Sequence, residues 1–501
     1  MTPSHTIPFR YRLLMLIAAA CLLALTGAAG RASAQAANPF DVEVVQTNAD
    51  LSQTLTHLPD LEFGRAPVAK LPAIAVNAGV RYQTVGGFGA AMTDTSAWLI
   101  ERELPAATRD ALMNELFGAT GIHLNFVRVP MGASDYTSNG RPYTYDDIAP
   151  GQSDPSLTHF SIAHDQAYIL PALREALAIN PQTEFLASPW TPPAWMKGNN
   201  SLGNVGDLGT LKATAYGPWG EYFVKFIQAY HQAGISIGAV TPQNEPANAT
   251  TYPGLNFAAG SEANWIAQDL EPSLSRAGLH PKIYGNDLGW GPNTNAYAST
   301  AVFGRAGSLL NGIAWHCYFG APGVMNEFRQ AASRLEQIVD ECSPGGITPT
   351  PTSEIVIASL RDWASTVALW NLALDPRGGP VQVPNTGCPA CVGLATINEG
   401  NKTVSLRRSY YQLGQASAFV APGAQRIKSE HFVSYVYPRS GVNVATPGLD
   451  DVAFKNPDGS IVLVAYDNSA AAIQFAVKWN GSSFSYQLPA QATATFVWDR
   501  P

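Results

Sequence analysis

The sequence has few charged residues and, beyond its first residues, no cluster of basic ones. Only 14% of its 501 residues are charged, and the formal net charge is −8. Because nucleic acids and anionic membranes are bound through clustered Lys and Arg, neither is an expected partner. No feature of the sequence indicates an obligate protein partner either. A hydrophobic content of 46% instead indicates a packed globular protein of enzyme size.

The N-terminal segment reads as a targeting signal. Residues 13–25 are an apolar run that follows two arginines, and the run is too short to predict a membrane-spanning helix. Small residues then lead to Ala34, a suitable cleavage position. We expect residues 1–34 to be a signal peptide and the mature protein to be secreted, extracellular or periplasmic. Cleavage removes three arginines and no acid, so the net charge changes from −8 to −11.

Cysteine is scarce, with five in the chain. The residues before Cys21 make a poor lipoprotein signal, so soluble export is favoured over a lipid anchor. Cys388 and Cys391 form a CxxC, but no second CxxC or histidine cluster accompanies it. We therefore expect a small disulfide rather than a zinc site. Cys317 and Cys342 are expected at the ends of neighbouring strands, and a disulfide between them is a further hypothesis.

Between residues 81 and 415 the sequence alternates strand and helix patterns. Asp165–Ala178 and Trp219–Gln232 show the 3.6-residue apolar repeat of amphipathic helices. Eight strands are expected, at Tyr82–Ala90, His123–Pro130, Glu184–Pro189, Ile235–Val240, Lys282–Gly285, Gly312–Tyr318, Gln337–Glu341 and Val367–Leu372. Eight such units predict an α/β fold, a (β/α)8 TIM barrel that would be the catalytic domain.

The flanking segments, 35–80 and 416–501, have β patterns without helices between them. The later strands are expected at Val433–Tyr437, Val452–Phe454, Ile461–Asp467, Ile473–Trp479 and Ala492–Trp498. We expect residues 416–501 to form a β-sandwich beside the barrel, with the strands of residues 35–80 completing it. No low-complexity linker separates the two parts.

Among the eight expected barrel strands, two end in a glutamate. Glu245 closes the fourth strand in Thr-Pro-Gln-Asn-Glu-Pro, and Glu341 closes the seventh. Catalytic groups of such barrels lie at the carboxyl ends of the strands, and two carboxylates there can flank a glycosidic bond. Each acid alone is equally explained as an ordinary strand-end residue. Glu354 competes as a nucleophile, although the first turn of a helix explains it, and Asp340 is expected to face away from Glu341 by strand alternation.

Several ordered motifs resemble glycoside hydrolase family 30, which contains glucosylceramidases and microbial β-1,6-glucanases. They are GGFGAAMTDTSAW (86–98), VRVPMGASDYT (127–137), ASPWTPPAWMK (187–197), TPQNEP (241–246), IAWHCY (313–318), DECS (340–343) and WNLALDPRGGP (370–380). The resemblance implies a barrel with a side β-sandwich, Glu245 as the general acid/base and Glu341 as the nucleophile. The sequence departs from the usual Thr-Glu or Ser-Glu by having Asp340 before Glu341. The loop 378–392 resembles the secreted bacterial branch of the family.

The resemblance also implies a sugar-binding set. Asp135 and Trp190 would bind ring hydroxyls, and Asn244 would bind the 2-hydroxyl. Tyr318 would lie near the nucleophile, and Trp370 would form an apolar floor under the sugar.

His316 would join this sugar-binding set or would be a structural histidine at a strand end, and Asp94 is more readily structural. Together these features predict a retaining β-glycosidase for a β-linked glucan or glucoside, without metal or cofactor. Glucosylceramidase and endo-β-1,6-glucanase activities stay open. β-Xylosidase or xylanase activity is an alternative, as is a non-catalytic carbohydrate-binding protein.

Overall fold

The computed structural model describes most of the chain after residue 40, and Pro39–Pro501 form one compact unit. The described residues are 41–64, 71–206, 209–291, 306–345, 350–382, 388, 390–430, 432, 435–436, 444–445 and 448–498. The expected signal peptide, residues 1–34, lies outside them. No helix in these ranges is long and apolar enough to cross a bilayer.

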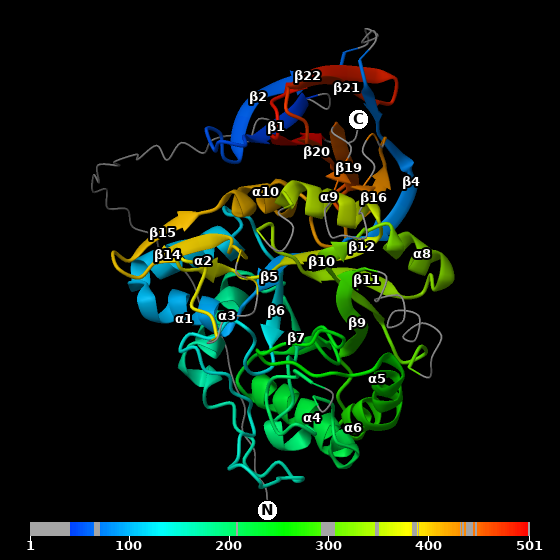
Figure 1. Ribbon diagram of the computed structural model, residues 1–501. Helices are drawn as coiled ribbons and strands as arrows, with labels where there is room; N and C mark the ends of the chain where they lie inside the picture. Colours follow the sequence, from blue (N-terminus) through cyan, green and yellow to red (C-terminus); the bar gives the residue numbers. More distant parts are fainter. Residues whose placement is uncertain are drawn as a thin grey trace, which may run out of the picture. The chain divides into compact units, whose positions relative to one another are not determined.

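Eight parallel strands close into a barrel, in chain order from β5 to β12, which pairs back onto β5 (Figure 1). They are β5 (Gly87–Ala91), β6 (Phe126–Pro130), β7 (Glu184–Ser188), β8 (Ile237–Val240), β9 (Lys282–Trp290), β10 (Gly312–Gly320), β11 (Glu336–Glu341) and β12 (Ala364–Leu369). The predicted TIM barrel is confirmed.

Helices follow most of these strands and cover the barrel. They include α1 (Asp94–Trp98), η1 (Leu99–Glu103), α2 (Ala106–Phe117), α3 (Ile169–Ile179), α4 (Tyr216–Gln232), α5 (Ala259–Trp265), η5 (Ile266–Leu270), α6 (Glu271–Arg276), α8 (Val324–Ala331), α9 (Thr352–Arg361) and α10 (Arg408–Ser417). The two amphipathic helices expected from the sequence correspond to α3, preceded by a 3-10 turn, and α4.

Three element boundaries differ from expectation. The strand expected over Tyr82–Ala90 is two: β4 (Asn77–Thr84) pairs with β16 (Gln425–Lys428) of the sandwich, and β5 starts the barrel at Gly87. β9 continues five residues beyond Gly285. The strand expected over Val367–Leu372 is β12, which begins and ends three residues earlier, at Ala364 and Leu369.

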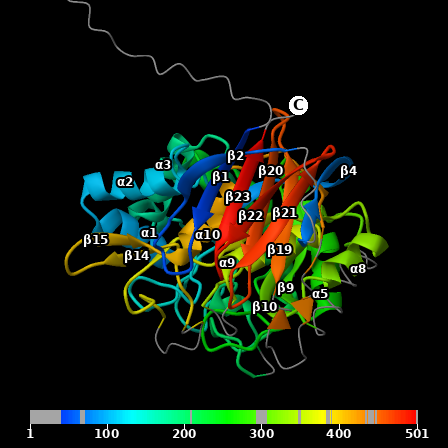
Figure 2. The same ribbon diagram turned by 90° about the horizontal axis from the view of Figure 1, so that it is seen from above.

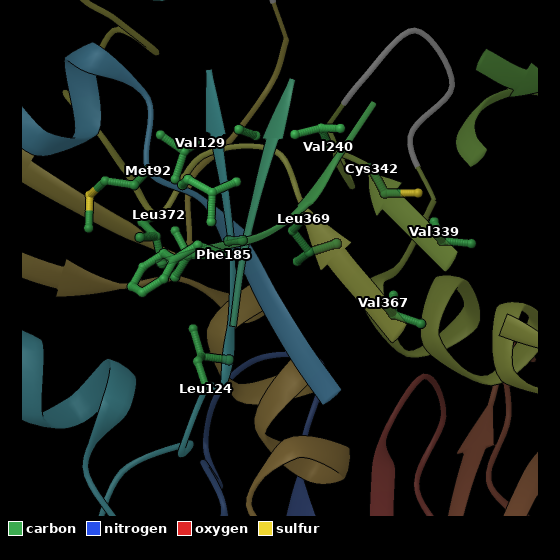
Figure 3. Packing of buried hydrophobic residues seen from close by; sticks show 14 of the residues in the cluster. Met92, Leu124, Val129, Phe185, Val240, Val339, Cys342, Val367, Leu369 and Leu372 are labelled. Atoms are coloured by element: carbon green, nitrogen blue, oxygen red, sulfur yellow. The ribbon is translucent and has the colours of Figure 1, made fainter. Parts of the chain in front are cut away.

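The barrel is filled by one apolar layer. Seven strands each contribute one buried side chain to it: Phe126, Leu186, Ala239, Tyr284, Ala314, Ile338 and Ala368. Neighbouring positions point outward, because successive side chains of a strand alternate between faces. Figure 3 shows outward residues such as Val129, Phe185, Val240 and Val339, which belong to the large core between strands and helices.

Two sheets form the β-sandwich. The larger has the order β2-β1-β23-β20-β19-β16-β4, and the smaller has the order β22-β21-β3 (Figure 2). Their remaining strands are β1 (Asp41–Thr47), β2 (Thr56–Glu62), β3 (Ala73–Ala75), β19 (Leu449–Lys455), β20 (Ile461–Asp467), β21 (Ile473–Trp479), β22 (Ser482–Leu488) and β23 (Thr493–Trp498). N-terminal strands therefore complete the sandwich, as predicted. The strand expected over Val433–Tyr437 lies largely outside the described residues.

Helices α9 and α10 lie between the barrel and the sandwich (Figure 1). α9 packs against β12 on one side and β19 on the other, and α10 packs against β1 and β23. Side chains bond across this junction, such as Gln415 with Thr47 and Thr495. The junction is thus packed and hydrogen-bonded, consistent with the lack of a linker in the sequence.

Candidate active site

A cavity of about 340 Å³ opens at the carboxyl ends of the barrel strands. Its lining residues come from the carboxyl ends of six of these strands and from the loops that follow them. They are Asp135, Trp190, Val205, Asn244, Glu245, Asn248, Ala249, Thr250, Thr251, Tyr252, Tyr318, Phe319, Glu341, Trp370 and Cys388. Seven of the eight residues assigned from the sequence to catalysis or sugar binding are among them. His316 is the exception.

A polar layer lies directly beneath the cavity. Five of its six members come from positions two residues beyond the apolar layer, which strand alternation also turns inward, and Asp287 lies three residues beyond Tyr284 at a bulge. Its members are fully buried: Arg128 (β6), Ser188 (β7), His316 (β10) and Asp340 (β11), joined by Thr241 after β8 and Asp287 on β9. A buried charge is costly unless it is paired, so the contacts among these side chains decide whether the layer is stable.

Arg128 is the centre of this layer. Its Nη1 lies 2.5 Å from Glu341 Oε2, and its Nη2 donates to Asp287, Ser188 and Asn244 at 2.8–3.1 Å. Its Nε lies 2.9 Å from Asp340 Oδ2. Burial disfavours the charged guanidinium, but these carboxylates raise the pKa of Arg128 further. The residue is a permanent cation that orients Glu341 and Asn244.

Asp340 corrects one sequence expectation. Strand alternation was expected to turn it away from the face of Glu341, yet both carboxylates contact Arg128. The pairing of β10 with β11 has a bulge, because Trp315 pairs with Val339 while His316 pairs with Glu341. Asp340 lies two residues beyond Ile338 and faces the barrel interior by regular alternation, whereas the bulge lets Glu341 reach the rim on the same side.

Glu245 follows β8 with a positive φ of 45°, an uncommon backbone conformation for a residue other than glycine. Its Oε1 lies 3.1 Å from His316 Nδ1, and its Oε2 accepts a bond of 2.6 Å from Asn248. The other ring nitrogen of His316 lies 2.9 Å from Asp287. His316 therefore bridges a cavity carboxylate and a buried carboxylate, which fixes its ring orientation.

The two cavity glutamates have different pKa shifts. Burial raises the pKa of Glu341, and the charge of Glu245 adds to this rise against the opposing charges of His316 and Arg128. Burial also acts on Glu245, but the hydrogen bond and charge of His316 bring the pKa of Glu245 below its ordinary value.

For His316, the effect of the nearby carboxylates on the pKa outweighs the effect of burial. Burial disfavours its charged form, but Glu341, Asp287 and Glu245 raise the pKa of His316 well above its ordinary value. In the free protein the proton of the His316–Glu245 pair therefore lies on the imidazole, 3.1 Å from the glutamate oxygen. Because these groups are coupled, moving that proton to Glu245 removes both the charge of Glu245, which raises the pKa of Glu341, and the charge of His316, which lowers it.

Aromatic rings form one wall of the cavity. Trp190 and Trp370 stack with their ring centres 5.1 Å apart, and the guanidinium of Arg128 lies 4.8 Å from the Trp190 ring. Tyr318 donates to Glu341 Oε1 at 3.0 Å. Burial, with the charge of Glu341, raises the pKa of Asp135 well above its ordinary value, which favours the protonated form that can donate a hydrogen bond.

His316, Glu354 and Asp94 lie away from the cavity surface. His316 is completely buried, so it supports Glu245 from behind rather than lining the sugar pocket. Glu354 lies in the first turn of α9 and its charge acts on Asp450 of the sandwich, which places it outside the site. Asp94 accepts bonds from Ser138, Tyr168 and His164, which fits the structural role favoured from the sequence.

Carboxylates and His316 are close enough here to surround a cation. Two such groups are Glu245 with His316 and Glu341, and Asp287 with His316 and Asp340. The second group already contacts the guanidinium of Arg128. The guanidinium of Arg128 thus supplies a fixed positive charge among these carboxylates.

Two disulfides lie beside the cavity, and both sequence expectations for them are confirmed. Cys388 is joined to Cys391 in the loop that also accepts a bond from Tyr136. Cys317 is joined to Cys342 and links the ends of β10 and β11 next to Glu341.

Sequence reasoning did not assign Arg128, Asp287 or Asn248 to the site. Arg128 lies inside a quoted motif, and an arginine in an otherwise apolar barrel strand was the available signal. Asp287 was missed because β9 was expected to end at Gly285. Asn286 and Asp287 both have positive φ and form a bulge, which no simple period reveals.

The site and fold define a class of protein: a (β/α)8 hydrolase with paired carboxylates at the barrel mouth. Residues 85–341 match the glycosyl hydrolase family 30 TIM-barrel domain, and residues 423–496 match the family 30 beta sandwich domain. The chain belongs to glycoside hydrolase family 30.

Several named enzymes are similar to this chain. An endo-1,6-beta-D-glucanase of Neurospora crassa is 32% identical over 82% of this chain and 86% of its own. The lysosomal acid glucosylceramidase of Mus musculus is 29% identical over 84% and 82%. A solved endo-beta1,6-glucanase is 28% identical and superposes with a TM-score of 0.79 over 92% of this chain and all of its own.

Proposed function

We propose that the protein is a secreted, retaining endo-β-1,6-glucanase. The spacing of its two carboxylates is the observation on which this proposal chiefly rests. One oxygen of Glu245 and one of Glu341 lie within 4.8 Å of each other and of a His316 nitrogen. Retaining enzymes have carboxyl groups about 5–5.5 Å apart, whereas inverting enzymes need about 6.5–9.5 Å to admit a water.

In the first step, Glu341 attacks the anomeric carbon and the bond to the leaving oxygen breaks. Glu245 gives a proton to that oxygen, and a glycosyl ester on Glu341 remains. The proton comes from the His316–Glu245 pair. Arg128 and Tyr318 hold the Glu341 carboxylate in the attacking position.

In the second step, Glu245 takes a proton from water, and the resulting hydroxide attacks the glycosyl ester. The sugar leaves with its original anomeric configuration, and both glutamates are regenerated. Asn244, oriented by Arg128, would bind the 2-hydroxyl, where the contact strengthens in the oxocarbenium-like transition state. Asp135, Trp190 and Trp370 would hold the other hydroxyls and the apolar face of the ring.

The choice of β-1,6-glucan rests on similarity. Fungal endo-1,6-beta-D-glucanases are 32–33% identical to the chain, and the glucosylceramidases are 27–29% identical. Glucosylceramide is therefore the second candidate substrate. Xylan is disfavoured because a xylanase at 21% identity shows only the shared fold. A non-catalytic binding role is disfavoured because both carboxylates line the cavity.

The test is product analysis with purified mature protein on β-1,6-glucan, glucosylceramide and xylan. We expect short β-1,6-linked oligosaccharides from the glucan, with the β-anomer formed first in an NMR time course. Glucose alone would contradict endo action, an initial α-anomer would contradict retention, and faster release from glucosylceramide would favour the second candidate.

Secretion is part of the proposal. It is supported by the two disulfides, which persist in oxidising compartments, and by the targeting pattern of residues 1–34. N-terminal sequencing of the exported protein should give a start near residue 35. Full-length protein retained in the cytoplasm would contradict secretion without affecting the assignment of the active site.

A further inference from the structure

Lys197 is a fully buried lysine next to the active site that the mechanism does not use. Its ammonium donates to four oxygens at 2.5–3.2 Å: the Thr191 hydroxyl and the carbonyls of Leu202, Gly203 and Gly254. None of these acceptors is charged. Among the described residues, which omit 207 and 208, Lys197 makes no ion pair within 4 Å.

The four acceptors belong to three segments of two loops, one between β7 and α4 and one after β8. Thr191 follows β7, Leu202 and Gly203 lie in the loop before α4, and Gly254 lies in the loop after β8. The ammonium therefore ties these segments together at one point. A lysine suits this role because its three donors are not constrained to one plane.

Two of these segments form one side of the cavity. Val205 lines it from the loop before α4, and residues 249–252 line it from the loop after β8. Asn204 joins the same two segments by donating to the carbonyl of Asn248 at 2.7 Å. Asn248 in turn bonds Glu245. This side of the cavity is therefore built around Glu245 rather than around Glu341.

We propose that Lys197 is a positioning residue that holds the leaving-group side of the cavity in place. The inference rests on the proposed roles of the glutamates, because the acid that protonates the leaving oxygen must face the leaving group. Lys197 thus sets how well the departing sugar is bound, whereas the sugar attached to Glu341 is held by other residues.

The proton on Lys197 makes this support dependent on pH. Burial lowers the pKa of Lys197 to about 7, and its four acceptors in the described part of the chain are neutral. A neutral amine has only two N–H donors for the four oxygens, so at least one more carbonyl loses its partner. Above about pH 7 the loops should be less firmly joined, and binding of the leaving sugar should weaken.

The experiment compares two substrates in the mature protein: β-1,6-linked glucotetraose, and gentiobiosyl β-fluoride, whose leaving group is one atom. For Lys197→Met we expect kcat/KM to fall at least tenfold on the tetraose, mainly through KM, and less than threefold on the fluoride. Lys212→Met is the matched control, since Lys212 bonds Trp195 and Asn200 but not the loop after β8. It should change neither value by more than about twofold.

An equal loss on both substrates, or no loss, would overturn the proposal. If Lys197→Met does not fold, the pH dependence of the wild-type protein tests the proposal instead. Its KM for the tetraose should rise at least threefold relative to its KM for the fluoride between pH 6 and pH 8.5, and a constant ratio of the two KM values would overturn the proposal. A wild type inactive on both substrates would instead contradict the proposed function.

Discussion

Replacing Arg128 by lysine tests how the polar layer supports the nucleophile. Lysine keeps the charge but cannot reproduce a planar fork that contacts Glu341, Asp287 and Asp340 together. A hydrogen bond to a charged group contributes about 1.5–3 kcal/mol. One pKa unit corresponds to about 1.36 kcal/mol, so loss of the bond to Glu341 should raise the pKa of that carboxyl by about one to two units.

The assay is the pH dependence of kcat/KM on an aryl β-glucoside. The acidic limb for Arg128→Lys should move to higher pH by one to two units, because the nucleophile must be ionised. Arg361→Lys is the matched control, because Arg361 is a largely buried arginine paired with Asp451 outside the site. The acidic limb of the kcat/KM profile of this variant should not move. An unchanged limb in Arg128→Lys, with only stability lost, would show that Arg128 does not tune Glu341.

Three further predictions follow. Glu245→Gln should lower kcat on β-1,6-glucan by about 10²–10⁴, yet give a dinitrophenolate burst equal to the enzyme concentration with a dinitrophenyl β-glucoside, because only protonation of a poor leaving group and water activation are lost. Burial raises the pKa of Glu354 to about 7, so the folded state holds a proton there that the unfolded state releases at lower pH. Stability should then fall by about 3 kcal/mol from pH 4.5 to pH 7, and urea unfolding of Glu354→Gln should show a smaller fall. Replacing Cys317 and Cys342 by serine opens a loop of 25 residues and should cost about 3 kcal/mol in the same unfolding assay, while a loss below 1 kcal/mol would show that the bond adds little.

The sequence predicts the parts of this protein that follow regular periods. Alternating strands and helices predict the barrel, and the position of Glu245 and Glu341 at strand ends predicts a shared cavity, in which the structure places both. Asp287 was not predicted, because it lies at a β-bulge where the two-residue period of side-chain direction is interrupted. The bulge between β10 and β11 likewise brings Glu341 to the same side as Asp340, which strict alternation does not predict. A bulge depends on how two strands pair, and a single strand carries no sign of it.

His316 shows a second limit of prediction from the sequence. Its place at the end of a strand is visible in the sequence, but its function depends on what each ring nitrogen contacts. Those contacts, Glu245 and Asp287, come from strands that are distant along the chain. The same holds for Arg128, whose partners lie on three other strands and after a fourth.

The chemistry assigned to Glu341 and Glu245 is tested most directly by the anomeric configuration of the azide adducts formed by their alanine variants. In Glu341→Ala, azide should occupy the vacated nucleophile position and displace the leaving group of an activated β-glucoside to give the α-glucosyl azide. In Glu245→Ala, Glu341 should first form the glycosyl ester, and azide should then give the β-glucosyl azide. A β-azide from Glu341→Ala, or wild-type turnover without azide, would contradict Glu341 as the nucleophile.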